Sequence, residues 1–438
     1  MSVVHFTRAK GPNRPRNTDR SIIAALDVGS TKVCCMIAEI VKLKNRPGEG
    51  AKRGLKVLGF GHQGARGMRG GAVIDIVEAE RSIRLAVDAA ERMAQTTISE
   101  VIVSFSGGRP SSTSRSGQVR ISGHEVSGAD MQRAVENAMA GLDLKNRVLL
   151  HASPVQFHLD DAHGVQRPLG MFGEFLKVDV NAVSAEPGAM RNLGLAIERC
   201  HLDVSHYVIA PHAGARAVLS PDEMAIGTTY VEMGGATTSV AVYHEGKLIF
   251  AHVIPLGGQH ITNDIARGLS THLAHAERLK TLQGSALAGL SDERETIAVP
   301  LIGERGVDSV HSVPRSRLTG IIRPRLEEIF EMLRDRLETS PVAALAGQRV
   351  VLSGGASQLS GLRELATQTL GCQVRLGMPR ALKGMPEVAQ KPAFAAVTGL
   401  LDHALNPDVA LHLPDRRQGR SLASNYLVQV GRWLKESF

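Results

Sequence analysis

Three glycine-bearing turns, each at the end of an apolar run, carry the residue types that bind phosphate. They read Asp27-Val28-Gly29-Ser30-Thr31-Lys32, Glu232-Met233-Gly234-Gly235-Ala236-Thr237-Thr238 and Ser353-Gly354-Gly355-Ala356. Glycine lets backbone N–H groups approach a phosphate, hydroxyl groups add donors, and an acidic residue at a strand end can hold a water on Mg²⁺. One such turn more commonly only reverses the chain, so the prediction of a split nucleotide site rests on all three together.

The composition is that of a soluble globular protein with several lobes. A chain of 438 residues exceeds one compact core, which predicts about two to four lobes. The net charge is +8, and the basic residues gather in residues 1–20 and near the C-terminus. Because no basic stripe with stacking aromatic residues lies between these ends, no nucleic-acid partner is expected, and an anionic membrane is favoured.

The four cysteines and the apolar runs place the chain in the cytosol. Cys34, Cys35, Cys200 and Cys372 form no C-x-x-C pair and are interpreted as reduced thiols. The N-terminus has no apolar leader, and no run of about eighteen uncharged apolar residues occurs. Any membrane contact is therefore expected to be peripheral.

The order of elements indicates a duplicated α/β lobe. Residues 21–40 predict a strand, the Gly29 turn and a returning strand, whereas a helix follows the glycine turn in a dinucleotide-binding βαβ unit. Residues 229–242 repeat this design, and a further strand follows at 247–254. Helices are expected over 78–95, 318–337 and 391–405, with strands over 101–105 and 349–353 and a polar, irregular insert over 106–181.

The last segment has a composition unlike the rest. Its apolar residues recur at helical spacing, and they are Tyr426, Leu427, Val430, Trp433, Leu434 and Phe438. A basic linker with no core-forming pattern precedes them, and a tryptophan with cationic neighbours suits a bilayer interface. We therefore predict a membrane-binding amphipathic helix over 425–438, with a terminal helix docked on the body as the alternative.

These features resemble the FtsA family of bacterial cell-division proteins, which belongs to the actin-like ATPase superfamily. The resemblance covers nearly the whole chain, with local support from residues 65–71, 253–258, 275–280 and 321–325. It implies an α/β, two-lobed actin-like fold with a division-specific insert. The implied parts are a basic disordered tail (1–20), a first lobe (21–97 and 182–216), the insert (98–181), a second lobe (217–262 and 346–402), an FtsZ-binding subdomain (263–345), a linker (403–424) and the membrane helix (425–438).

The resemblance also implies ATP and Mg²⁺ between the lobes. Asp27 then lies near the metal, through water, with Gly29, Ser30, Thr31 and Lys32 as the first phosphate loop. The second loop is Gly234, Gly235, Ala236, Thr237 and Thr238. Gly354, Gly355 and Ala356 back the adenosine, and Glu277 and Lys280 lie near the ribose and base. For these last two residues an exposed helical ion pair is the alternative.

Two residues depart from the superfamily's second-loop pattern, D-x-G-G-G-T. Glu232 replaces the aspartate and Ala236 the third glycine. A glutamate reaches about 1.5 Å further, and errors of about 1 Å in position cost on the order of a hundredfold in rate. We therefore expect bound ATP to be hydrolysed slowly or not at all and to act as an assembly ligand, with Asp27 and Glu232 as candidates near metal and water.

By the same resemblance the protein polymerises on the inner face of the cytoplasmic membrane at the septum. It holds the C-terminal tail of FtsZ, with Arg317 and Arg325 as candidate contacts, and recruits later division proteins. An ordinary surface ion pair is the alternative for Arg325. A small-molecule kinase of the same fold and a pilus-assembly relative are the competing functions, and residues 425–438 argue against both.

Overall fold

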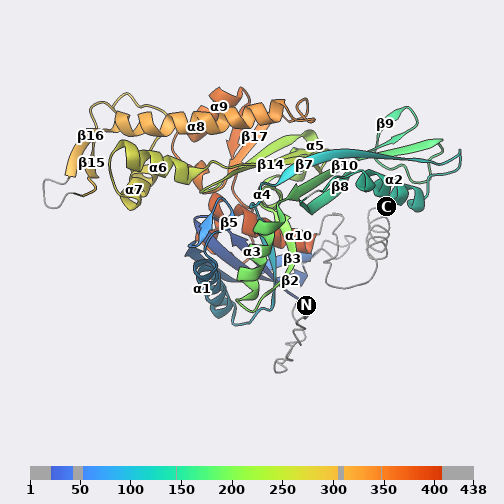
Figure 1. Ribbon diagram of the computed structural model, residues 1–438, viewed down its shortest axis with the longest axis horizontal. Coiled ribbons are helices and arrows are strands. Elements are labelled where there is room, and N and C mark those ends of the chain that lie inside the picture. Colours follow the sequence, from blue (N-terminus) through green and yellow to red (C-terminus); the bar gives the residue numbers. More distant parts are fainter. Residues whose placement is uncertain (1–20, 43–52, 145, 304–309, 347, 407–438) are drawn as a thin grey trace, which may run out of the picture.

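The computed structural model describes residues 21–42, 53–144, 146–303, 310–346 and 348–406. The predicted basic tail over 1–20, most of the predicted linker and the predicted membrane helix over 425–438 lie outside the described residues. Within the described part, two sheets form two lobes, and two smaller units extend from opposite ends of the longest axis (Figure 1).

The first lobe is built on a five-stranded sheet with the order β11-β6-β1-β2-β3. β1, β2 and β3 form an antiparallel meander, and β6 and β11 add parallel strands. The strands are β1 (Ile22–Val28), β2 (Lys32–Lys42), β3 (Arg53–Gly64), β6 (Glu100–Phe105) and β11 (Asp203–Ile209), with a small hairpin of β4 (Met68–Arg69) and β5 (Ala72–Val73). The predicted strand-turn-strand over residues 21–40 and the strand over 101–105 are confirmed.

Helices α1 (Ile76–Ala94) and α3 (Pro187–Glu198) cover one face of this sheet. Asp75 caps α1 by accepting hydrogen bonds from the backbone N–H groups of Val77 and Glu78. The helix comes very close to β3, because a Cβ on Gly61 would lie 2.0 Å from the Ala86 carbonyl oxygen. The small residues of β3 therefore set how closely α1 packs.

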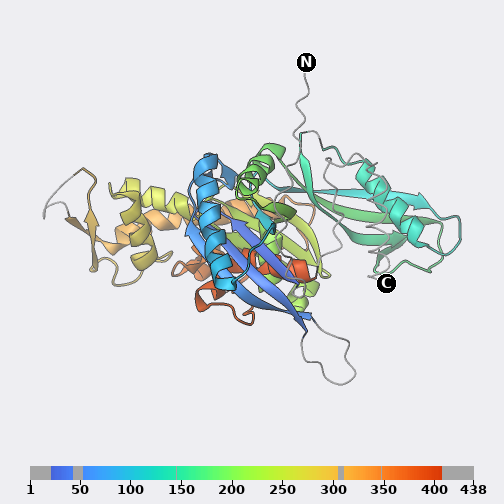
Figure 2. The same ribbon diagram turned by 90° about the horizontal axis from the view of Figure 1, so that it is seen from below.

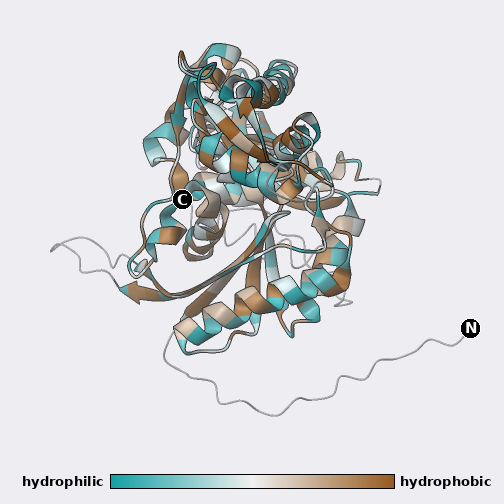
Figure 3. Ribbon diagram, turned by 90° about the vertical axis from the view of Figure 1, so that its left-hand side faces the viewer, coloured by the Kyte–Doolittle hydropathy of each residue, from teal (hydrophilic) through white to brown (hydrophobic). Residues whose placement is uncertain are grey.

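The second lobe repeats the first strand for strand. Its strands are β12 (Thr228–Met233), β13 (Thr238–His244), β14 (Lys247–Ile254), β17 (Arg349–Ser353) and β18 (Gln373–Leu376). The order β18-β17-β12-β13-β14 again places an antiparallel meander beside two parallel strands, which confirms the predicted duplication. In both lobes the strands are mainly hydrophobic, whereas the surface helices mix hydrophilic and hydrophobic residues (Figure 3).

Two helices cross between the lobes, and this corrects the expected division of the chain. α10 (Ala395–Leu405) was expected in the second lobe, but it packs against the first sheet beside β3 (Figure 1). α4 (Ala210–Val218) was expected in the first lobe, but its buried face shares a core with Tyr230 and Tyr243 of the second sheet. Each half thus contributes a helix to the other half's core because both helices are apolar on nearly all sides.

The insert is a regular α/β unit, contrary to the expected irregular segment. It consists of β7 (Ser111–Arg120), α2 (Gly128–Ala140), β8 (Val148–Leu159), β9 (Ala162–Val165) and β10 (Phe175–Ala185), with a core of its own. It begins after β6, since β6 belongs to the first sheet, rather than at residue 98. The serine-rich sequence of β7 does not predict a strand, and the segment is extended because it pairs with β10.

The insert continues the second sheet through a pairing of Ser111 with His252 on β14. Arg147 fastens its base by donating to the carbonyl oxygens of Arg109 (2.8 Å) and Ser184 (2.6 Å). The same guanidinium donates to the Ser111 hydroxyl (3.1 Å), so it joins the first and last strands of the insert. Seen from below, the insert projects away from the helices of the second lobe (Figure 2).

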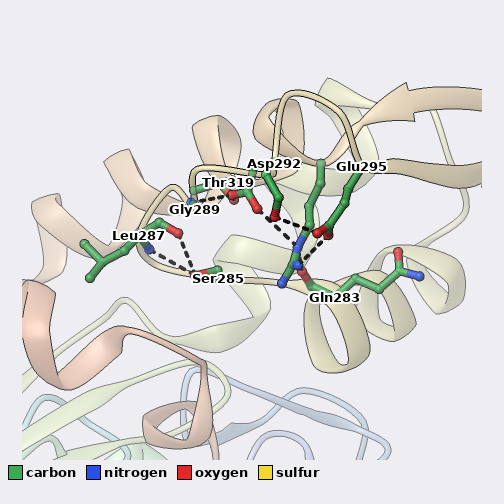
Figure 4. A network of polar contacts seen from close by, with 9 residues as sticks. Gln283, Ser285, Leu287, Gly289, Asp292, Glu295 and Thr319 are labelled. Atoms are coloured by element: carbon green, nitrogen blue, oxygen red, sulfur yellow. Dashed lines mark hydrogen bonds and ion pairs between the residues drawn. The ribbon is translucent and has the colours of Figure 1, made fainter.

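A helical subdomain extends from the other end of the second lobe. It contains α6 (Gly258–Gly268), α7 (Leu273–Gln283), a hairpin of β15 (Thr296–Pro300) and β16 (Val310–Pro314), and α8 (Arg315–Glu338). Asp292 ties the loop before the hairpin to α8, since it accepts from the Gly289 N–H (2.8 Å) and lies 3.8 Å from the Arg315 guanidinium (Figure 4). The remaining elements are α5 (Pro221–Ile226), α9 (Leu362–Leu370) and three short 3-10 turns at Gly355–Gln358, Glu387–Gln390 and Pro392–Phe394.

The α4–α10 crossing predicts a large effect for one added methyl group. A Cβ on Gly399 would lie 1.6 Å from the Ala213 carbonyl oxygen. Gly399→Ala is expected to destabilise the protein by about 3 kcal/mol or more, because helix backbones cannot separate without opening both cores. The measurement is the urea midpoint by circular dichroism.

Gly320→Ala is the matched control, since Gly320 also lies inside a helix and no atom stands within 4 Å of the place that its added methyl group would take. That variant is expected to gain up to about 1 kcal/mol from helix propensity. Equal midpoints for the two variants would contradict the close crossing.

Candidate functional site

The two lobes present equivalent hairpin turns to each other. In the first, the Gly29 N–H donates to the Lys32 carbonyl oxygen (2.9 Å), and in the second the Gly234 N–H donates to the Thr237 carbonyl oxygen (2.8 Å). The turns meet, because a Cβ on Gly235 would lie 2.3 Å from the Thr31 Cγ2. The structure therefore brings the first two sequence-predicted loops together.

Asp27 and Glu232 hold the same place in the two hairpins, one residue before the end of the strand. The buried Asp27 carboxylate accepts from the Ser104 hydroxyl (2.5 Å) and the Lys32 ammonium (2.9 Å). Burial is the largest influence and lowers the pKa of Lys32, but the attraction to Asp27, Cys34 and Glu232 and the hydrogen bond to Asp27 together outweigh it, so the net pKa lies above the ordinary value. Lys32 is thus held by the carboxylate, with Phe394 5.3 Å from its ammonium.

The Glu232 carboxyl has a different environment from the Asp27 carboxylate. Its Oε2 atom is buried and has no hydrogen-bond partner among the described residues. Burial raises the pKa of Glu232 to about 8, the nearby Asp27 charge adds to this, and Lys32 opposes it. The Glu232 carboxyl is therefore mostly protonated at neutral pH.

The second turn is fixed by the start of α6. The N–H groups of Gly258 and Gln259 donate to the carbonyl oxygens of Gly234 (2.9 Å) and Gly235 (2.6 Å). The Thr238 hydroxyl donates to the Leu256 carbonyl oxygen, and the Ala236 side chain is buried. The turn is therefore rigid, and its carbonyl groups face α6.

Glu277 and Lys280 on α7 lie beside the start of α6. They form the ion pair that helical spacing predicts, at 2.7 Å. The Lys280 ammonium also donates to the Gly258 carbonyl oxygen (3.0 Å) and the Thr262 hydroxyl (2.8 Å), so its three donors all have acceptors. Lys280 thereby positions the first turn of α6 next to the second hairpin.

The third predicted turn lies against the second turn and the start of α6. Gly354 has a φ of 87°, and a Cβ there would lie 2.5 Å from the Met233 carbonyl oxygen, so glycine is required. A Cβ on Gly258 would lie 3.2 Å from the Ala356 Cβ and 3.5 Å from the Lys280 Nζ. Gly258 is consequently the point where the second turn, α7 and the third turn meet.

Sequence reasoning missed three residues of this site. Gly258 follows an apolar strand as part of a Gly-Gly pair, which is a signal of the same kind as the other turns. Ser104 and Phe394 carry no such signal, because their roles depend on strand pairing and on the crossing of α10 into the first lobe.

The predicted partner-binding arginines both lie on α8. Arg325 forms ion pairs with Asp264 on α6 (2.6 Å) and with Glu328. Arg317 is exposed and donates to the Gly268 carbonyl oxygen (3.3 Å). Eight residues of helix place them about 12 Å apart along the axis.

The residues around Asp27 are compatible with a phosphate ligand and a water-bridged cation. Gly235 and Gly354 lie so close to atoms of a neighbouring turn that a Cβ would not fit, and each Asp27 carboxylate oxygen keeps a lone pair beyond its present hydrogen bond. No group of three or more His, Cys, Asp or Glu side chains with metal-binding geometry occurs within the described ranges. None of the described helices is long and apolar enough to cross a membrane.

A duplicated five-stranded sheet, two facing hairpin turns and crossed helices define an actin-like two-lobed protein. The chain resembles the structure of a PilM–PilN type IV pilus biogenesis complex (TM-score 0.60, 20% identity, 88% of this chain and 99% of that chain). It also resembles MreB5 of Spiroplasma citri bound to AMPPNP (TM-score 0.50, 12% identity, 89% and 96% covered). These likenesses show the fold.

The chain belongs to the FtsA family, and it is a cell division protein. It is 41% identical to the cell division protein FtsA of Rhizobium meliloti over 97% of both chains, and 33% identical to that of Pseudomonas aeruginosa over 88% of this chain and 89% of that one. Residues 229–399 match the model of the cell division protein FtsA. Residues 107–184 match the SHS2 domain inserted in FtsA, which identifies the insert.

The buried carboxyl oxygen of Glu232 predicts a pH-dependent stability. Its carboxyl ionises near pH 4.5 in the unfolded chain but near pH 8 in the folded protein. Between these values unfolding releases a proton, so the free energy of unfolding falls by up to about 1.4 kcal/mol per pH unit. Glu232→Gln removes this loss and is expected to unfold at higher urea than the parent, by a margin that grows from pH 5 to pH 8 and is then constant.

The exposed Glu331→Gln on α8 is the matched control, and its urea midpoints should follow those of the parent at every pH. Parallel curves for Glu232→Gln and the parent would show that Glu232 is ionised in the folded state.

Proposed function

We propose that this chain binds ATP with Mg²⁺ between its lobes and assembles into filaments on the inner face of the cytoplasmic membrane at the division septum. There it tethers the FtsZ ring and recruits later division proteins. Membership of the FtsA family supports the assembly role. The single observation that carries the nucleotide part is the meeting of the two hairpin turns at Thr31 and Gly235.

In the proposed complex each predicted residue has a defined part. Gly29, Ser30, Thr31 and Lys32 contact phosphate from the first lobe, and the turn from Gly234 to Thr238 contacts it from the second. Asp27 holds Mg²⁺ through water, and the metal supplies charge neutralisation for the phosphates. The adenosine packs against Gly354, Gly355 and Ala356. Its ribose lies next to Glu277 and Lys280.

The site favours binding over hydrolysis. A water nucleophile needs a base, but Glu232, in the position of the second loop's acid, holds its proton at neutral pH. Asp27 is already engaged by Lys32 and Ser104. We infer that ATP acts as a ligand that closes the lobes, and that hydrolysis is slow.

The centre of the proposed adenosine site predicts where a side chain excludes ATP. In Gly258→Val the new Cβ would lie 3.2 Å from the Ala356 Cβ, 3.5 Å from the Lys280 Nζ and 3.6 Å from the Gly234 carbonyl oxygen. The dissociation constant for a fluorescent ATP analogue is expected to rise about a hundredfold, since the added atoms occupy the ligand's volume. Equilibrium fluorescence titration measures it.

Gly188→Val is the control, because nothing lies within 4 Å of the added Cβ in α3. Unchanged affinity in a folded Gly258→Val protein would place the nucleotide elsewhere. In the parent, single-turnover hydrolysis is expected to be slower than about one per second, and a faster rate would overturn the binding-only role.

The membrane part of the proposal rests on residues 425–438. Their apolar stripe and basic neighbours suit an interfacial helix, and each cation near an anionic leaflet contributes about 1 kcal/mol. Assembly on ATP would present many such helices at once and raise avidity.

Truncation tests this attachment directly. The intact chain is expected to pellet with anionic liposomes, more strongly with ATP, whereas a chain ending at Ser424 is expected to stay in the supernatant. Neutral liposomes serve as the charge control. Equal pelleting of the two chains would contradict the anchor.

The FtsZ tail is proposed to bind the subdomain over residues 263–345, with Arg317 offering its guanidinium to an acidic peptide. Arg325 would have to exchange Asp264 for the peptide. Arg317→Ala should weaken binding of an FtsZ tail peptide in fluorescence anisotropy more than Arg323→Ala on the same helix, and equal binding would remove Arg317 from the site.

A further inference from the structure

A cavity of about 520 Å³ lies away from the hairpin turns, where the second lobe, the insert and α10 adjoin. Its walls come from α4, α5, β8, β14 and the end of α10. The apolar part of the lining is Pro154, Leu219, Pro221, Met224, Tyr243 and Leu248. A cavity of this size and lining is of the kind that binds ligands or peptide segments.

The cavity is also positively charged. Arg216, Lys247 and Arg380 line it, and Asp402 is the acidic residue of the lining. The Asp402 carboxylate forms an ion pair with the Arg216 guanidinium (2.8 Å). An occupant that carries one carboxylate and several apolar side chains would match both features of the wall.

The chain itself leads into this cavity. Asn406, the last described residue, is part of the lining, and its carbonyl oxygen accepts a hydrogen bond from the Arg216 guanidinium (2.9 Å). Its N–H donates to the Asp402 carbonyl oxygen (2.9 Å). The point at which 32 further residues leave the body is therefore fixed at the cavity wall.

We propose that residues 408–413 of this chain fill the cavity. Their sequence is Asp-Val-Ala-Leu-His-Leu, between Pro407 and Pro414. In an extended segment Val409, Leu411 and Leu413 point to one side and pack on the apolar wall, and Asp408 meets the Arg216 and Arg380 side. The first part of the predicted linker is thus a strap that fastens α10 to the second lobe and the insert.

The strap defines where the remaining linker starts. If the tail attaches to a membrane, which is the proposed function, a pulling force on the tail would act on the contact between the second lobe and the insert. It would not act on the end of α10. The docking itself needs no membrane, and it can be tested in solution.

Hydrogen exchange of the full chain, measured by mass spectrometry without lipid, tests the strap. The amides of residues 408–413 are expected to exchange at least about tenfold more slowly than those of 415–424. Leu411→Asp and, from the cavity side, Met224→Trp should each remove this protection. Leu427→Asp is the matched control in the same tail and should leave it unchanged.

Equal exchange of 408–413 and 415–424 in the parent would overturn the proposal. Protection that rises with protein concentration would assign the cavity to a second copy of the chain and overturn it too. Retained pelleting of Leu411→Asp with anionic liposomes, alongside lost protection, would support the strap and separate it from the membrane anchor.

Discussion

The crossing of α4 and α10 is the constraint on which the rest of the structure depends. With Gly399 against the Ala213 carbonyl group, two helix backbones touch at the junction of the lobes, and each helix fills the core of the other half. A lobe cannot move without rotating about this contact, because separation would expose both cores to water. The facing hairpin turns are therefore brought together by a feature that contains none of their residues.

This arrangement gives two equivalent carboxyl groups different chemistry. Asp27 and Glu232 occupy the same strand position in the duplicated lobes, but Ser104 and Lys32 serve only Asp27. The longer Glu232 side chain ends in a buried, unpartnered oxygen among the described residues and keeps its proton. The same strand position thus carries two different carboxyl environments, because only Asp27 has Ser104 and Lys32 as hydrogen-bond donors.

The elements of the duplicated lobes were predictable, because their periodicity is local. Residues 349–353 and the helix over 318–337 follow directly from apolar spacing. The insert was not, since β7 reads Ser-Ser-Thr-Ser and is a strand only by virtue of pairing with β10. The lobe to which α10 belongs could not be predicted either, because a helix that is buried on nearly all sides does not specify which sheet it covers. Within the site the glycine turns gave a signal, whereas Ser104 and Phe394 acquire their roles through tertiary contacts alone.

The two hairpin turns are proposed to form one nucleotide site only while they touch. The most direct test is the ATP affinity of Gly235→Ala, in which the new Cβ would lie 2.3 Å from the Thr31 Cγ2 and would push the turns apart. Affinity is expected to fall about tenfold or more with an unchanged circular dichroism spectrum, and to recover in part when Thr31→Ser removes the Cγ2 atom and keeps the hydroxyl group. Unchanged affinity in Gly235→Ala would contradict this proposal.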